Sequence, residues 1–241
     1  MTRIGIIPAR YNSSRFPGKP LVEIHGKTMI QRVYERVLQA ELDDVIIATD
    51  DERIKEHIQS FRGKVVMTSS DHQTGTERCN EVLSAYDADV ILNIQGDEPY
   101  MLPSDINSLA QLFDDQEVEI GTLVREASSR SEMLDEHTAK VVLDTNWNAL
   151  YFSRSAIPFN KTGKDDLFYL HIGMYGYRKQ VLQDLCRLSP SKLELTESLE
   201  QLRWLENGYK IRCGLSESLH HSVDTPEDLE RLLEMNFEKD L

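Results

Sequence analysis

The sequence predicts an α/β fold built on a doubly wound, mostly parallel sheet. Short β-branched runs alternate with amphipathic stretches, and several runs are apolar at successive positions, as in strands buried on both faces. The chain has 241 residues, of which 40% are hydrophobic, so it is long enough to bury a sizeable core. Because no internal repeat or linker interrupts the pattern, we expect a single domain over residues 1–241.

The first half of the chain has the rhythm of βαβ units. Strands are predicted at residues 4–9, 45–49, 64–68, 90–94 and 120–124. One helical face between the first two strands carries Met29, Ile30, Val33, Val37 and Leu38. Ile54 and Ile58 repeat this pattern more weakly before the third strand. Such alternation indicates parallel strands joined by helices.

The rhythm loosens after residue 125, where we expect an antiparallel excursion. Further strands are predicted at 141–144, 150–153 and 172–177, and the polar run 160–166 is typical of an exposed loop. A helix is predicted over 193–207, with Gly208 as its C-terminal cap. A last helix is predicted to open at Thr225, because an N-capping threonine followed by proline and acidic residues favours a helix start.

Charge and composition exclude several classes of protein. The net charge of -14 disfavours coating nucleic acid or an anionic membrane, since an acidic surface repels phosphate. Residues 1–40, however, hold seven basic residues against two acidic ones, which suits a small anionic ligand. Three distant cysteines without a CxxC motif suggest neither a disulfide framework nor a zinc site. The lack of a membrane-length apolar stretch and of a signal-peptide pattern predicts a cytoplasmic location.

The loop that follows the first predicted strand, residues 8–21, concentrates groups suited to phosphate. Ligands of open α/β sheets bind beyond the carboxyl ends of the strands. Arg10, Arg15 and Lys19 supply positive charge there, and Gly18 permits backbone contacts. The loop lacks the GxxxxGK[ST] pattern and the chain has no GxGxxG, which disfavours P-loop and dinucleotide sites. Either a triphosphate site or a solvated basic loop fits this composition.

Two carboxylates follow apolar runs elsewhere in the chain. Asp97 lies in the segment 95–99 after the fourth strand, and Asp224 directly precedes the last helix. Carboxylates at such positions suit a hard cation such as Mg²⁺, and we expect the two to converge on one metal that holds a phosphate chain. The alternative for 95–99 is a helix-capping turn. Residues 87–89 match the DxD pattern, but they precede their strand, which favours a turn.

Polar residues also gather at other predicted strand ends. The segment 68–78 is rich in hydroxyls and amides, so it either reads a base or ribose or serves as a capping loop. Alternation in 151–154 and 171–177 places Arg154, His171 and Tyr175 on one pocket wall. The alternative for a lone strand histidine is a structural residue with satisfied hydrogen bonds.

Together these segments resemble the cytidylyltransferases that activate 3-deoxy-manno-octulosonate (Kdo), the CMP-Kdo synthetases. The matching stretches occur in order at 7–10, 17–21, 48–50, 71–78, 95–99, 149–154, 173–178, 199–203 and 223–229. The resemblance implies a nucleotide-diphospho-sugar transferase-like fold. It also implies that the anomeric hydroxyl of an acidic octulosonate sugar attacks the α-phosphate of CTP and releases pyrophosphate. A homodimer and a place in lipopolysaccharide synthesis are implied as well.

The resemblance implies a role for each candidate site residue. Arg10 and Lys19 would grip the triphosphate, and Asp97 and Asp224 would hold Mg²⁺ as the cofactor, so these four are the expected catalytic residues. Further CTP contacts are expected from Ser69, Ser70 and Gln73. The residues expected to line the sugar pocket are Gln95, Arg154, His171, Tyr175, Glu200 and Gln201. Arg154 is expected to pair with the sugar carboxylate.

Two segments depart from the family pattern. The residues 220–222 are His-His-Ser where the family has small residues, and 193–198 lacks the usual histidine. An added carboxylate there would suit an ammonium group, so Kdo and 8-amino-8-deoxy-Kdo both stay open as the sugar. The alternatives are a cytidylyltransferase for another acidic sugar such as sialic acid, a glycosyltransferase of similar topology, and a non-catalytic nucleotide-binding module. Segment 199–203 favours the Kdo enzymes, and the paired metal carboxylates favour catalysis.

Overall fold

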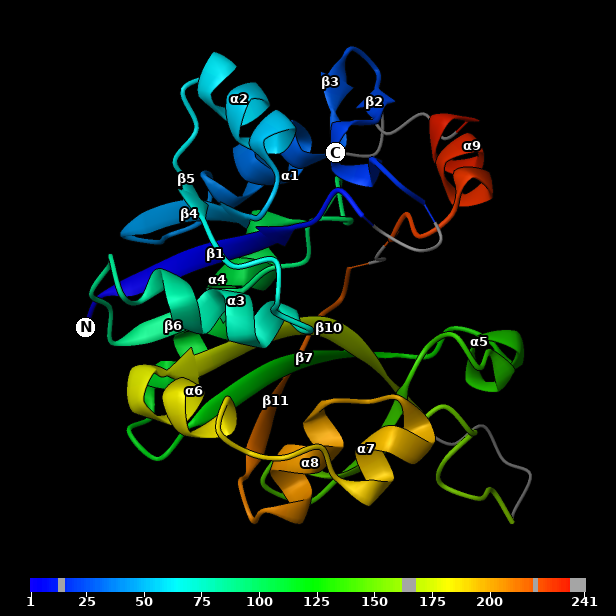
Figure 1. Cartoon of the computed structure of the whole chain (residues 1–241). Helices are drawn as coiled ribbons and strands as arrows, with labels where there is room; N and C mark the ends of the chain where they lie inside the picture. Colours follow the sequence, from blue (N-terminus) through cyan, green and yellow to red (C-terminus); the bar gives the residue numbers. More distant parts are fainter. Residues whose placement is uncertain (13–15, 162–167, 219–220, 235–241) are drawn as a thin grey trace. The chain divides into compact units, whose positions relative to one another are not determined.

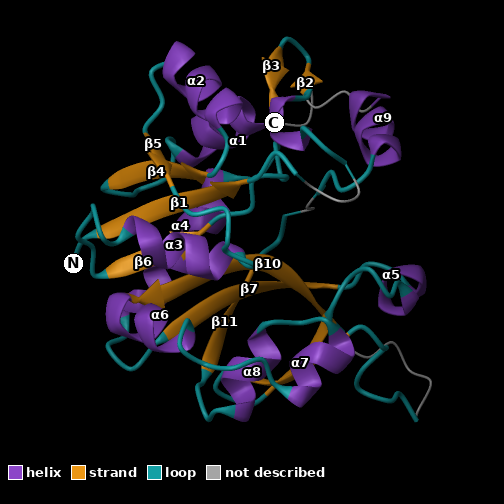
Figure 2. Cartoon of the chain, in the orientation of Figure 1, coloured by secondary structure: helices purple, strands orange, loops and turns teal. Residues whose placement is uncertain are grey.

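The computed structural model describes residues 1–12, 16–161, 168–218 and 221–234 (Figure 1). It has the predicted α/β class, with strands and helices alternating along the chain (Figure 2). Contacts divide the chain into two compact units, Met1–Asn107 with Leu219–Leu241 and Ser108–Ser218. Arg15, His220 and most of the loop expected at 160–166 lie outside the described residues. The single domain expected over residues 1–241 stays a prediction.

The first unit holds a parallel sheet with strand order β6-β1-β4-β5. Its strands are β1 (Arg3–Ala9), β4 (Asp44–Thr49), β5 (Val65–Met67) and β6 (Val90–Asn93). Ile6 in the central strand pairs with Ile46 on one side and Asn93 on the other. Since all four strands run the same way, their carboxyl ends share one edge, where ligands of open sheets bind.

The helices α1 (Met29–Val37), α2 (Glu52–Ser60) and α3 (Gly75–Val82) connect these strands and cover the sheet. A fourth helix, α4 (Pro103–Gln111), follows β6 and leads toward the second unit. The Thr28 side chain caps α1 by accepting from Gln31 N at 3.3 Å. The predicted apolar face of α1 is buried, except that Leu38 caps the helix and is exposed. Right-handed crossovers place α3 on the opposite face from α1 and α2, because its connection runs back across the sheet.

Short elements in the first unit bring its C-terminal segment against its N-terminal loop. These are the 3₁₀ turn η1 (Lys19–Leu21), the hairpin β2 (Glu23–Ile24) and β3 (Lys27–Thr28), and α9 (Pro226–Glu234). Ile24 and Met29 pack with Val223 and Leu232 in a small buried cluster. Thr225 opens α9 as predicted, since its hydroxyl accepts from Asp228 N at 3.2 Å.

The second unit contains the antiparallel excursion expected after residue 125. β7 (Ile120–Glu126) pairs antiparallel with β10 (Tyr169–Arg178) and parallel with β11 (Ile211–Leu215). β8 (Lys140–Leu143) pairs antiparallel with both β10 and β9 (Ala149–Ser153). The remaining elements are η2 (Leu112–Asp114), α5 (Arg130–Leu134), α6 (Lys179–Leu185), α7 (Lys192–Glu197) and α8 (Gln201–Glu206).

The single helix predicted over 193–207 is wrong, because the chain forms α7 and α8 with a break between them. Ser198 ends α7 in the left-handed region, with φ 54°. Gly208 does end α8 as predicted, with φ 86° and a hydrogen bond of 3.1 Å from Tyr209 N to Trp204 O. The leucine spacing continues across the break, so periodicity alone did not reveal it. Among the described residues, none of these helices is long and apolar enough to cross a bilayer.

Candidate functional site

Lys19 is placed by a tight turn at the end of the loop that follows β1. Gly18 N donates to Tyr11 O at 2.8 Å, and Gly18 adopts φ 76°, a left-handed conformation that favours glycine. Pro20 then fixes the first turn of η1 and is buried. The lysine therefore leaves a rigid turn, and its side chain is only 13% exposed.

Asp97 is placed by the loop that follows β6. A Cβ on Gly96 would lie 2.9 Å from Pro8 O, so only glycine lets this loop approach the end of β1. Ile94 N donates to Ile6 O at 2.9 Å and ties the start of the loop to the same strand. Asp97 therefore stands at the carboxyl edge of the sheet.

Asp224 reaches the same place from the C-terminal segment. Val223 is fully buried, and its N–H donates to Asp97 O at 2.9 Å. On the other side, the carboxylate of Asp228, in the first turn of α9, accepts from Asp224 N at 3.0 Å. Backbone bonds on both sides thus hold Asp224 beside Asp97.

The two carboxylates meet at the ammonium of Lys19. Lys19 Nζ lies 2.7 Å from Asp97 Oδ2 and 3.2 Å from Asp224 Oδ1, so the two aspartates do lie near each other, while their expected convergence on a metal stays a prediction. Burial raises the pKa of Asp97, Lys19 lowers it, and the neighbouring charges of Glu98 and Asp224 raise it further. Two carboxylates held side by side at this edge are also the kind of oxygen ligands that a divalent cation uses.

Asp97 and Asp224 match the way in which proteins usually coordinate Mg²⁺. Among the residues that the structure describes, no three His, Cys, Asp or Glu side chains form a metal-holding group. Mg²⁺ commonly takes one or two carboxylates and completes its shell with water and substrate phosphates. The converging pair Asp97 and Asp224 therefore suits a metal that arrives with a phosphate ligand.

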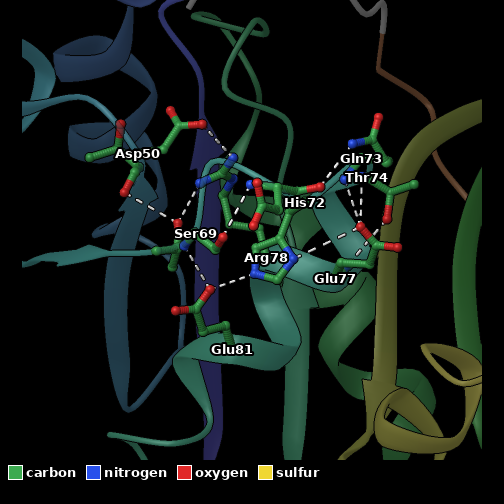
Figure 3. A network of polar contacts seen from close by, with 11 residues as sticks. Asp50, Ser69, His72, Gln73, Thr74, Glu77, Arg78 and Glu81 are labelled. Atoms are coloured by element: carbon green, nitrogen blue, oxygen red, sulfur yellow. Dashed lines mark hydrogen bonds and ion pairs between the residues drawn. The ribbon is translucent and has the colours of Figure 1, made fainter.

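Arg10 directly follows β1 and belongs to a second cluster of charged side chains. Burial lowers the pKa of Arg10, and the nearby charge of Arg78 lowers it further. Arg78 is fully buried; its Nη2 lies 2.9 Å from Asp50 Oδ2, and its Nη1 donates to the hydroxyl of Thr68 (Figure 3). Sequence reasoning did not assign Asp50 or Arg78 to the site. The signal that could have revealed Arg78 is a charged residue beside Cys79 on the buried face of the helix.

The loop after β5 carries the three weaker nucleotide candidates. Ser69 is half-buried, whereas Ser70 and Gln73 are exposed. The capping role considered for this segment is also present, since Thr74 and Glu77 form a capping box at the start of α3. The loop therefore serves as a cap and still presents polar side chains at the carboxyl edge of the sheet.

In the second unit, His171 is positioned by a β-bulge. The pairing of β10 with β7 shifts between Ile172 and Tyr175. Thr122 Oγ1 donates within this bulge to Met174 O at 2.8 Å, and His171 Nε2 lies 3.0 Å from the same hydroxyl. The same hydroxyl lies 3.2 Å from Ile172 O, and its single proton can serve only one of these acceptors. Burial lowers the pKa of His171 to about 3, so the ring is neutral.

Around Tyr175, polar atoms are buried without partners. The Tyr175 ring centroid lies 5.2 Å from that of His171 and 5.0 Å from that of Trp204. Within the described residues, Tyr175 Oη, Gln201 Nε2 and Trp204 Nε1 are buried and make no hydrogen bond. Glu200 lies close enough for its charge to contribute to the raised pKa of Tyr175. Such orphaned atoms indicate a polar ligand or water, and sequence reasoning missed Trp204.

The remaining two sugar candidates belong to other segments. Gln95 is part of the first unit, in the loop that follows β6. Arg154 follows β9 and donates to the backbone carbonyls of Glu136, His137 and Glu197 at 2.9–3.1 Å. Its guanidinium is therefore engaged, and its expected pairing with a sugar carboxylate stays a prediction.

Comparisons with known proteins relate this geometry to one family. Residues 4–211 match a family described as Cytidylyltransferase. A 3-deoxy-manno-octulosonate cytidylyltransferase of Bacteroides thetaiotaomicron is 52% identical over 240 residues, covering 95% of this chain and 96% of the relative. An 8-amino-3,8-dideoxy-manno-octulosonate cytidylyltransferase of Shewanella sp. is 47% identical over 237 residues, covering 96% and 97%.

Solved structures show the same relationship. The structure of a CMP:2-keto-3-deoxy-manno-octonic acid synthetase complexed with CTP superposes with a TM-score of 0.95 at 43% identity, over 100% of both chains. A putative glucose-1-phosphate thymidylyltransferase from Bacillus anthracis gives a TM-score of 0.69 at 17% identity, covering 98% of this chain and 97% of that one. The second likeness concerns the fold alone.

Substitution of Asp50 by alanine should destabilise the protein strongly. It would leave the guanidinium of Arg78, which is fully buried, without its carboxylate, at a cost of about 3 kcal/mol or more. Glu52→Ala, which removes an exposed pair with Lys55, should cost less than about 1 kcal/mol. Urea denaturation of both variants measures the difference. Equal midpoints for the two would show that Arg78 does not depend on Asp50.

The neutral state of His171 should make stability depend on pH. Its pKa is about 3 in the fold against an ordinary value of 6.5, so the unfolded chain binds a proton more readily. Its contribution to the free energy of unfolding is therefore complete above pH 6.5 and falls with pH down to about 3. The slope is at most about 1.4 kcal/mol per pH unit. Denaturation of wild type and His171→Gln over this range should show a shallower pH dependence in the variant; identical slopes would contradict the assignment.

Proposed function

The chain belongs to the cytidylyltransferase family, and we propose that it couples CTP to the acidic sugar Kdo, with Mg²⁺ as cofactor, to give CMP-Kdo and pyrophosphate. The observation that carries the proposal is the meeting of Lys19, Asp97 and Asp224 at the carboxyl edge of the sheet. The relatives named for Kdo cytidylyltransferase activity support the choice of CTP and sugar. Family membership sets aside the non-catalytic alternative.

The reaction requires charge neutralisation and alignment more than covalent chemistry. The anomeric oxygen of the sugar forms a bond to the α-phosphorus, the bond between α-phosphorus and bridging oxygen breaks, and pyrophosphate leaves with the electron pair. The hydroxyl proton passes to water. Arg10 and Lys19 would hold the phosphates in line for this displacement. Asp97 and Asp224 would hold Mg²⁺, which supplies positive charge at the phosphates and acidifies the attacking hydroxyl.

Lys19 is placed to serve both the carboxylates and the phosphates. Its ammonium partly neutralises the half-buried Asp97 and the neighbouring Asp224. When Asp97 and Asp224 bind Mg²⁺, the ammonium of Lys19 would be able to pair with a phosphate oxygen of CTP. In the second charged cluster, Asp50 pairs directly with Arg78, and Arg10 would supply its guanidinium to the phosphates.

In the second unit, the neutral His171 and the orphaned atoms of Tyr175 and Gln201 suit sugar hydroxyls. Gln201 Nε2 can donate, the Tyr175 hydroxyl can donate and accept, and a neutral His171 ring has one donor and one acceptor nitrogen. Burial raises the pKa of Tyr175, so its hydroxyl keeps its proton. A polyhydroxy ligand would therefore satisfy groups that the protein leaves without partners.

The departures from the family pattern do not create a free carboxylate on α7. Glu194 pairs with Arg203 and accepts from Ser191 N at 2.9 Å. Glu197 accepts from Ser153 Oγ at 2.7 Å and Arg154 N at 2.9 Å. Glu194 therefore already has a cationic partner in Arg203, whereas the donors to Glu197, a hydroxyl and a backbone N–H, leave its negative charge in place. The choice of Kdo rests on the relatives named for it.

Pyrophosphate release from CTP and Mg²⁺ tests the proposal. We expect turnover with Kdo that exceeds turnover with 8-amino-8-deoxy-Kdo or sialic acid. Asp97→Asn and Asp224→Asn should each lower kcat by about a hundredfold or more, because each removes charge beside the phosphates. Glu227→Gln, an exposed change in the same segment as Asp224, should leave the rate unchanged.

Three outcomes would overturn parts of this proposal. Preference for the 8-amino sugar would reassign the substrate, and preference for sialic acid would replace the octulosonate. If none of the three sugars supported pyrophosphate release, the proposed class of acceptor would be refuted. The homodimer, the cytoplasmic location and the place in lipopolysaccharide synthesis stay predictions.

A further inference from the structure

The loop between β5 and α3, residues 69–74, is fastened along α3 by two glutamates. Glu81, in the last turn of α3, accepts from Ser69 N at 2.8 Å and contacts His72 Nε2 at 2.5 Å through the same oxygen, Oε2. Glu77, one turn earlier, accepts from Gln73 N at 2.7 Å and Thr74 N at 3.3 Å. The first residue of the loop is therefore bonded to the C-terminal end of α3, and the last two residues of the loop are bonded to the N-terminal end of α3.

His72 lies between these two carboxylates (Figure 3). Its Nδ1 is 3.9 Å from Glu77 Oε2, and its Nε2 bonds to Glu81. Glu77 and Glu81 are neighbours four positions apart on one helical face, where like charges repel. The hydrogen bond from Ser69 N lowers the pKa of Glu81, and His72 adds to this effect. Since an ionised carboxylate only accepts, the ring must carry its proton on Nε2.

Short local bonds direct the polar side chains of this loop. Ser69 Oγ accepts from Asp71 N at 3.1 Å, so its own proton is not needed for that bond. Gln73 Nε2 donates to Asp71 O at 2.8 Å, which fixes the orientation of its amide. Glu81 bonds the same loop at Ser69 and His72, so these local bonds form on a backbone that Glu81 holds in place.

We propose that Glu81, acting through His72 and Ser69, is a positioning residue that holds the 69–74 loop in its nucleotide-binding form. This inference rests on the proposed function, in which Ser69, Ser70 and Gln73 contact CTP. A loop held in its bound shape loses less conformational entropy on binding, so the bonds of Glu81 increase CTP affinity without touching the reacting atoms. Removing them weakens the ground state and the transition state alike, which raises KM and leaves kcat in place.

Calorimetric titration with CTP and Mg²⁺ tests the proposal independently of turnover. Glu81→Ala should weaken CTP binding by about tenfold, because the loop must then be ordered by the ligand. Glu81→Gln keeps an acceptor for Ser69 N and should recover most of that loss. His72→Ala should weaken binding as well, and the double variant should be little worse than Glu81→Ala, since both act through one contact.

Glu132→Ala is the matched control. Glu132, in the second unit, also accepts from a backbone N–H, Ser128 N, at 2.8 Å, and it pairs with Arg125. Its loss should leave CTP affinity unchanged. Amide hydrogen exchange of residues 69–74 should accelerate in Glu81→Ala and stay the same in Glu132→Ala.

Two results would overturn the positioning role. One is unchanged CTP affinity in folded Glu81→Ala; the other is a kcat loss as large as the rise in KM. Failure of wild type to bind CTP would instead refute the proposed function. Binding of CTP without turnover on any sugar would leave the comparison of variants valid.

Discussion

The contact of one lysine ammonium with two aspartates is the constraint on which the candidate site depends. Lys19, Asp97 and Asp224 come from three distant segments, and each is fixed by its own backbone geometry. Gly18 sets the turn before Lys19, Gly96 allows the approach of Asp97, and Val223 anchors Asp224. A change in any of these segments would separate charges that neutralise one another in a half-buried place.

Two guanidinium groups lie near each other on this acidic protein. The chain carries a net charge of -14, yet Arg10, just after β1, lies close enough to Arg78 of α3 for the charge of Arg78 to lower its pKa. Asp50 and Glu77 act on Arg10 in the opposite direction, so two carboxylates accompany the two guanidinium groups. A guanidinium held in place among such partners can exchange a carboxylate for a phosphate oxygen when a nucleotide binds.

The sequence was sufficient for the fold class and for the meeting of Asp97 with Asp224. Parallel strands share one carboxyl edge, so topology alone places the residues after β6 there. Glu81 and Arg78 could not be assigned in the same way, because their partners depend on how the loop after β5 folds along α3. The break at Ser198 could not be predicted either, because the spacing of apolar residues continues through it. The contacts of Arg154 with the carboxylate and the carbonyl of Glu197, which lie at the break, join residues far apart in the sequence. When the role of a residue depends on side chains from several loops, the periodicity of apolar residues along the sequence is not enough to predict it.

Crystals grown with CTP and Mn²⁺, a metal whose anomalous scattering marks its position, would test the central claim most directly. We expect one metal peak within coordination distance of carboxylate oxygens of both Asp97 and Asp224, with Lys19 Nζ moved onto phosphate oxygens. A metal bound away from these two aspartates, with Lys19 still held between them, would contradict it.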